Sequence, residues 1–263
     1  WFGCACCPSN ICRFIPSLPG YVYAVHHDEI YVNMFAGSTA VLDVAGRKVT
    51  LTQTTEYPWN GDVKIDVSPQ GKQQFALKIR IPGWVRGKPV PSDLYAYADD
   101  KQLSYSVKVN GATVESTLDK GYFTVRRQWR KGDAVEVHFD MVPRTVKADD
   151  RVAADRGKIA VECGPVVYCG EEADNKFDIF SVLFSRKPEF TVEKSSDLAG
   201  INRIRATVQT LDYDDSGRLA TRDERLSLIP YYAWNHRGAG KMTVWFPQSV
   251  SAVRIASEKN INL

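Results

Sequence analysis

Two adjacent cysteines near the start of the chain, Cys6 and Cys7, offer the most reactive side-chain chemistry in the sequence. They precede Pro8, which suits the first position of a helix. A helix N-terminus favours negative charge and therefore thiolates, and two neighbouring thiolates can share one Zn²⁺ at Zn–S distances of about 2.3 Å. Two core thiols or a vicinal disulfide stay equally open, because the paired Cys-x-x-Cys spacing of common zinc sites is missing.

The histidines offer no comparable ligand pair. His26 and His27 are adjacent, and adjacent residues of a strand point to opposite faces, so we interpret them as part of a turn with solvated imidazoles. His138 alternates with apolar neighbours, which predicts the solvent face of a strand. His236 falls in a polar loop after an aromatic segment. That loop could touch a sugar or a neighbouring domain, and we favour a structural role for it.

The other cysteines and the tryptophans are expected to be structural. Cys163 and Cys169 would lie about 20 Å apart on one extended strand, too far for a disulfide, which favours buried core thiols. Cys4 and Cys12 are also assigned structural roles. Aromatic rings can stack on sugars, but packing at the ends of a β-sandwich is favoured for each tryptophan considered; Trp129 and Trp245 are expected in the core, and Trp59, Trp84 and Trp234 near turns or loops.

The elements that must position these residues change from helix to strand near residue 20. Apolar residues recur at helical spacing from Pro8 to Leu18, with Pro16 as a kink and Pro19-Gly20 as the end. Short β-branched and aromatic segments then follow, and Asn110-Gly111 is a strong hairpin signal. Apolar and polar residues alternate strictly in 62–67 and 74–81, which predicts one buried face and one face in water for each strand. The strands are expected at 20–25, 29–35, 40–44, 48–53, 62–67, 74–81, 106–109, 113–114, 122–125, 134–139, 158–168, 188–193, 204–211, 226–229 and 241–246, with 158–168 interrupted by Gly164-Pro165. This pattern indicates β-sandwiches, with a boundary in the charged stretch 147–157.

Composition excludes several classes of function. The 263 residues are 44% hydrophobic and 25% charged, which is typical of a globular protein. The net charge is +3, and basic and acidic residues are interleaved along the sequence, so there is no basic cluster of the kind that binds nucleic acid. No run approaches the roughly 18 apolar residues of a membrane helix, so neither nucleic acid nor membrane is expected as a partner. The first residue is Trp1, which favours a piece of a longer or processed polypeptide.

The motifs resemble those of glycoside hydrolase family 127 and its relative family 146. The resemblance begins with the double-cysteine segment and spans nearly the whole chain in the family's order. The matching segments are Trp1 to Asn10, 18–23, 31–33, 55–61, 77–84, 109–111, 121–122 with Trp129, 132–133, 163–168, 229–234 and 244–247.

This resemblance implies a mainly β fold: two consecutive β-sandwich domains, at 29–147 and 148–263, preceded at 1–28 by the last loop and helix of an (α/α)6 barrel. It also implies retaining hydrolysis of β-L-arabinofuranosides. Cys6 takes the position of the nucleophile and of a zinc ligand, and Cys7 that of a zinc ligand. The other ligands, a glutamate and a third cysteine, and the general acid/base glutamate would lie upstream.

The resemblance further implies an arabinofuranose-containing glycan as substrate and an upstream barrel domain of the same polypeptide as partner, and it allows a homodimer.

Two other classes of function compete with this hypothesis. A non-catalytic carbohydrate-binding or structural β-sandwich module explains the strands but gives Cys6 and Cys7 no role. A redox dithiol is disfavoured because these two cysteines are adjacent rather than spaced as Cys-x-x-Cys.

Overall fold

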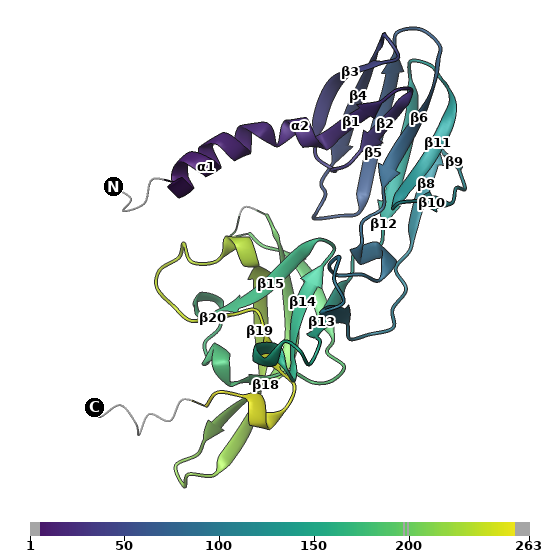
Figure 1. Ribbon diagram of the computed structural model, residues 1–263. Helices are drawn as coiled ribbons and strands as arrows, with labels where there is room; N and C mark the ends of the chain where they lie inside the picture. The colour runs from purple at the N-terminus through teal and green to yellow at the C-terminus, as the bar shows by residue number, and fades with distance from the viewer. Residues whose placement is uncertain (1–5, 197, 199, 256–263) are drawn as a thin grey trace. The chain divides into compact units, whose positions relative to one another are not determined.

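The computed structural model describes residues 6–196, 198 and 200–255, and its chain divides into two compact units (Figure 1). The first unit takes in the described residues up to Arg86 together with Leu103–Asp140, and the second takes in Gly87–Gln102 and the described residues from Met141 onward. The chain therefore leaves the first unit at residue 87 and returns to it at residue 103. Nothing in the sequence pattern indicated this exchange, and the domain limits 29–147 and 148–263 stay a prediction.

The N-terminal segment is helical but interrupted by its prolines. The helix α1 spans Cys6–Phe14, the 3-10 turn η1 spans Ile15–Ser17, and α2 spans Pro19–Val22. Pro8 is thus the third helical residue rather than the first, a position where a missing N–H costs no helical hydrogen bond. The expectation that Pro19-Gly20 ends the helix, with a strand from residue 20, is wrong. Proline fits the first turn of a new helix, so α2 begins there and the strand begins at Tyr23.

The first unit is built from two sheets, one with the strand order β1-β2-β6-β11-β10 and one with the order β3-β4-β5-β12-β8-β9. Their strands are β1 Tyr23–His26, β2 Glu29–Val32, β3 Ser38–Val44, β4 Arg47–Thr55, β5 Asp62–Pro69, β6 Gln73–Arg80, β8 Tyr105–Val109, β9 Ala112–Thr113, β10 Leu118–Asp119, β11 Tyr122–Trp129 and β12 Asp133–Phe139, with the 3-10 turn η2 at Trp84–Arg86. Asn110 and Gly111 have φ values of 51° and 80° in the β8–β9 connection, which confirms the predicted hairpin.

The alternation predicted for 62–67 and 74–81 is found in β5 and, with one exception, in β6. In β5 the residues alternate between buried and accessible positions, as expected for a strand with one face in the core. In β6, however, Ala76 is buried on the face that was expected to meet water. It lies between Glu29 and Arg126 on the neighbouring strands, and the long side chains of this ion pair cover the small one.

Aromatic side chains fill the core of the first unit. Trp129 is fully buried, its indole N–H donates to the carbonyl of Phe75 at 3.1 Å, and the two rings stack at 5.6 Å. Phe139 contacts Phe35 and Trp84, with ring centroids 5.3 and 5.9 Å apart. The predicted core position of Trp129 is confirmed.

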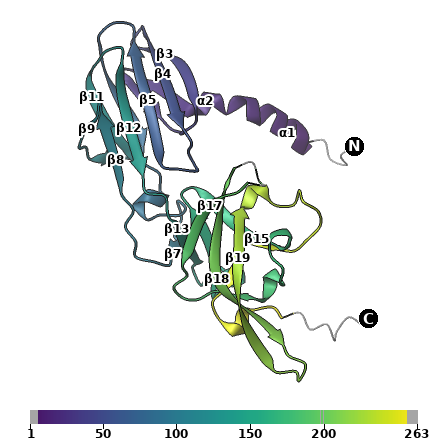
Figure 2. The same cartoon turned by 180° about the vertical axis from the view of Figure 1, so that it is seen from behind.

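The second unit is dominated by one ten-stranded sheet, with the order β16-β18-β19-β15-β14-β13-β7 and three further strands paired to its sides. The bounds are β7 Tyr95–Tyr97, β13 Pro143–Ala148, β14 Lys158–Cys163, β15 Val166–Glu171, β16 Val182–Leu183, β17 Phe190–Lys194, β18 Asn202–Tyr213, β19 Leu219–Pro230, β20 Met242–Thr243 and β21 Phe246–Pro247. Its 3-10 turns are η3 Ala153–Asp155, η4 Glu172–Asp174, η5 Ile179–Ser181, η6 Tyr231–Ala233 and η7 Val250–Ala252. Figure 2 shows β17, β18 and β19 side by side.

Two strand predictions for this unit are wrong. Residues 158–168, predicted as one strand interrupted at Gly164-Pro165, form two strands: Gly164, with φ of 57°, turns the chain so that β14 and β15 pair antiparallel. Residues 241–246 form only the short strands β20 and β21, which pair with different partners. Trp245 lies between them, half-buried, and stacks on Tyr95 at 5.8 Å instead of lying in the core.

None of the described helices is both long enough and apolar enough to cross a membrane.

Candidate functional site

Cys6 and Cys7 lie side by side in the first turn of α1. Their sulfur atoms are 3.8 Å apart, and both side chains are exposed. A disulfide has an S–S length of about 2.05 Å, so no disulfide joins the two sulfurs, which are within hydrogen-bond distance of each other. Two ligands at about 2.3 Å from a tetrahedral zinc lie about 3.8 Å apart, which is the separation found here. The pair thus has the spacing of two thiolates that share one metal ion.

The described part of the chain does not complete such a site around them. Within residues 6–196, 198 and 200–255, no group of three or more His, Cys, Asp or Glu residues is arranged to hold a metal. Cys12 is exposed further along α1, and Cys4 lies outside the described residues. Cys6 and Cys7 therefore fit as two ligands of a set that needs residues from elsewhere.

The two buried cysteines and the adjacent histidines take the positions that the sequence indicated. Cys163 and Cys169 are buried in β14 and β15, and burial raises their pKa values to about 11 and 12, so both are inert thiols at neutral pH. His26 and His27 are exposed at a turn in which His27 has φ of 54°. His236 is exposed in the loop after β19.

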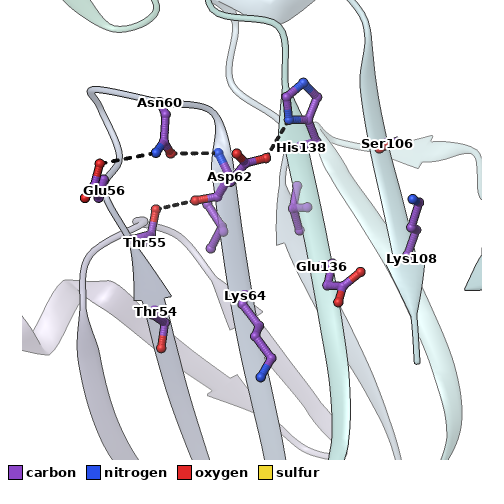
Figure 3. Close-up of a pocket in the computed structure, with 12 residues that line it drawn as sticks. Thr54, Thr55, Glu56, Asn60, Asp62, Lys64, Ser106, Lys108, Glu136 and His138 are labelled. Carbon is purple, nitrogen blue, oxygen red and sulfur yellow. Dashed lines mark hydrogen bonds and ion pairs between the residues drawn. The ribbon is translucent and has the colours of Figure 1, made fainter. Parts of the chain in front are cut away.

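His138 lies on the outer face of the first unit's six-stranded sheet, beside a polar hollow of about 690 Å³ (Figure 3). Its Nδ1 is 2.6 Å from the Asp62 carboxylate, and Glu136 lies between Lys64 and Lys108 on the adjacent strands. Opposite charges at facing positions stabilise a sheet by about 0.2–1 kcal/mol per pair. This cross-strand pairing accounts for the charges without a ligand.

Two domain models of one enzyme family match the chain in succession. The middle domain of family 127, described as a β-L-arabinofuranosidase, matches residues 29–141. The C-terminal domain of glycoside hydrolase family 127 matches residues 143–247.

The chain belongs to glycoside hydrolase family 127.

Relatives of known structure or activity support this membership. A non-reducing end β-L-arabinofuranosidase of Bifidobacterium longum is 32% identical over 93% of this chain. A solved β-arabinofuranosidase of family 127 is 55% identical with a TM-score of 0.94 over 97% of this chain, and a β-L-arabinofuranosidase from Geobacillus stearothermophilus T6 is 34% identical with a TM-score of 0.82 over 94% of it. This family 127 chain spans 37% of the first relative and 40% and 38% of the two structures.

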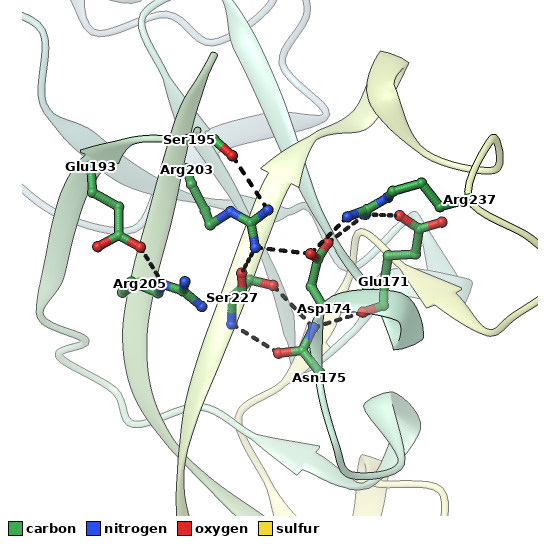
Figure 4. Close-up of polar contacts among 9 residues, drawn as sticks. All are labelled: Glu171, Asp174, Asn175, Glu193, Ser195, Arg203, Arg205, Ser227 and Arg237. Carbon is green, nitrogen blue, oxygen red and sulfur yellow. Dashed lines mark hydrogen bonds and ion pairs between the residues drawn. The ribbon is translucent and has the colours of Figure 1, made fainter. Parts of the chain in front are cut away.

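A buried ionic network in the C-terminal family 127 domain escaped sequence reasoning (Figure 4). Arg203 donates to the Asp174 carboxylate at 2.8 Å and to the Ser227 hydroxyl at 3.0 Å. Arg237 donates to Asp174 at 2.8 Å and also to Glu171. The side chains of Glu171 and Asp174 are only 4% and 5% exposed, so pairing with two arginines offsets their desolvation. The sequence gives no signal for this network, because its residues come from four separate segments, at 171–174, 203, 227 and 237.

Proposed function

We propose that this chain is the C-terminal portion of a retaining glycoside hydrolase that cleaves β-L-arabinofuranosides, with Cys6 as nucleophile and both Cys6 and Cys7 as zinc ligands. The observation that carries the proposal is the 3.8 Å separation of the two sulfurs in the first turn of α1. Membership of family 127 and the activities named for the relatives support the substrate class.

In this mechanism Cys6 would act as nucleophile and Cys7 would act as a metal ligand. Bound zinc supplies charge neutralisation, which keeps both sulfurs as thiolates at neutral pH. The Cys6 sulfur attacks the anomeric carbon, a C–S bond forms, and the C–O bond to the leaving group breaks. Water then attacks the same carbon and the C–S bond breaks, so the sugar leaves with its original configuration after two inversions. Cys7 holds the metal and, through it, the position of Cys6.

Other groups must complete the reaction. The proton that the leaving oxygen takes up, and the removal of a proton from water, require a general acid/base. By the family resemblance this glutamate and the remaining zinc ligands lie in an upstream barrel domain of the same polypeptide. A non-catalytic binding module is the weaker hypothesis, since it leaves the metal-compatible spacing of Cys6 and Cys7 without a purpose.

The test uses the whole polypeptide that contains this chain. Cys6→Ser should lower kcat on a β-L-arabinofuranoside by at least about a thousandfold, because a serine hydroxyl is far less ionised than a thiolate and leaves poorly in the second step. Cys12→Ser is the matched control, since Cys12 is an exposed cysteine of the same helix. Zinc content is measured in each protein. A Cys6→Ser enzyme that is active and zinc-replete would rule out Cys6 as nucleophile.

A further inference from the structure

The loop that follows β19 presents aromatic rings to solvent. Tyr231 is 46% exposed and Tyr232 is 65% exposed, and Trp234 is partly buried beside them. The rings of Tyr231 and Trp234 are nearly parallel, at 20°, with their centroids 6.4 Å apart. Neighbouring exposed aromatic residues mark a binding surface more often than a single exposed apolar residue does.

This loop is fixed rather than free. The backbone N–H of Asn235 donates to the Glu171 carboxylate at 3.1 Å, and Arg237 joins the buried network of Glu171 and Asp174. Ala233, 7% exposed, packs in a small apolar core below the loop. The aromatic rings are therefore presented by a backbone that is anchored at both ends, so binding would cost little ordering of the loop.

Tyr232 is the most accessible aromatic side chain of this loop, with 65% of the residue exposed. A flat accessible ring is the shape that the C–H face of a sugar can cover.

The charge of the loop favours a neutral ligand. The guanidinium of Arg237 is matched by two carboxylates, and the exposed residues that directly follow the aromatic segment in sequence are Asn235 and His236. These groups donate and accept hydrogen bonds, as the hydroxyls of a glycan require. An aliphatic docking partner would leave these polar groups without hydrogen-bond partners.

We propose that residues 231–236 form a non-catalytic surface that binds a neutral glycan chain. The choice of an arabinose-containing glycan rests on the proposed function, whereas the surface itself rests on the loop. The site holds the polysaccharide on the C-terminal domain while hydrolysis takes place elsewhere in the polypeptide.

The test is affinity electrophoresis of the 263-residue chain in gels that contain arabinan. The wild-type chain should be retarded, and the double variant Tyr231→Ala/Tyr232→Ala should bind at least about tenfold more weakly, because it loses both exposed rings. Tyr213→Ala is the matched control, since Tyr213 is 51% exposed at the end of β18, away from the loop in sequence. Thermal unfolding verifies that all three proteins are equally folded.

Each outcome decides the proposal. A wild-type chain that arabinan does not retard, or a double variant that binds like wild type, overturns it. Amide hydrogen exchange without sugar adds a second readout. If residues 231–237 exchange more slowly in the whole polypeptide than in the 263-residue chain, another part of the polypeptide covers the loop, and the proposal is overturned. The binding test does not depend on turnover. Binding of arabinan through this loop therefore supports the proposed surface even if the polypeptide does not hydrolyse arabinofuranosides. That second result would count only against the proposed function.

Discussion

The carboxylate of Glu162 on β14 accepts a hydrogen bond from the hydroxyl of Tyr97 on β7, which comes 65 residues earlier in the chain. The guanidinium carbon of Arg144 lies 3.4 Å from the centre of the Tyr97 ring, and Arg144 forms an ion pair with Asp99 at 2.8 Å. Glu162, Tyr97 and Arg144 are all buried. This cluster attaches the segment 87–102 to the second unit.

The first prediction concerns the pH dependence of this cluster. Burial raises the pKa of Glu162 from 4.5 to about 7. The folded state therefore binds more protons than the unfolded state between these values, so the stabilising contribution is full below about pH 4.5 and is lost as pH rises through about 7. The loss is at most about 3 kcal/mol. Glu162→Gln cannot ionise and should flatten this decline, measured by urea unfolding at pH 5 and pH 8.

Glu136→Gln is the control for that experiment, because Glu136 is an exposed glutamate on β12. It should leave the pH dependence as in wild type. If Glu162→Gln and wild type lose equal stability between pH 5 and pH 8, Glu162 is not the titrating group.

The second prediction concerns Gly61, where the chain passes close to β12. A Cβ atom at this position would lie 1.8 Å from the carbonyl oxygen of Phe139, whose N–H donates to the Gly61 carbonyl at 3.0 Å. Because the obstacle is backbone, Gly61→Ala should destabilise the first unit by about 1–3 kcal/mol or more. Gly37→Ala has open space around its Cβ and serves as the control in denaturant unfolding. Equal midpoints for the two variants would contradict the close approach.

The third prediction separates Cys7 from Cys6 in the whole polypeptide. Cys7→Ser removes a proposed ligand but not the proposed nucleophile, so zinc content should fall and part of the activity should return at high zinc concentration. Cys6→Ser should not be rescued in this way. Zinc content measured alongside the rate distinguishes the two roles. If both variants lose zinc and activity in the same way and respond equally to added zinc, Cys6 and Cys7 have the same role.

The fourth prediction is that the two β-rich units fold without metal. Their cores are apolar and aromatic, as around Trp129 and Phe246, whereas Cys6 and Cys7 are exposed. A strong chelator should leave the far-UV circular dichroism signal of the β-strands and the Tm of the chain nearly unchanged. A large loss of structure would show that zinc contributes to folding.

The sequence by itself determined the features that depend on near neighbours. Alternation in 62–67 placed one face of β5 in the core, because successive side chains of a strand point to opposite sides. Asn110-Gly111 specified a hairpin, because both residues tolerate positive φ. Cys6 and Cys7 came together at a helix start because they are adjacent in the chain.

Only the tertiary structure decided which distant segments meet. The Gly164-Pro165 interruption within 158–168 did not by itself show that the two halves pair as a hairpin, and nothing local assigned residues 87–102 to the second unit. The burial of Glu171 and Asp174 depends on arginines 29 or more residues away from Asp174 in sequence, at positions 203 and 237. A local pattern records which side of an element avoids water. A charged side chain can be buried only where the fold supplies its partner, and that choice is made by the packing of the whole unit.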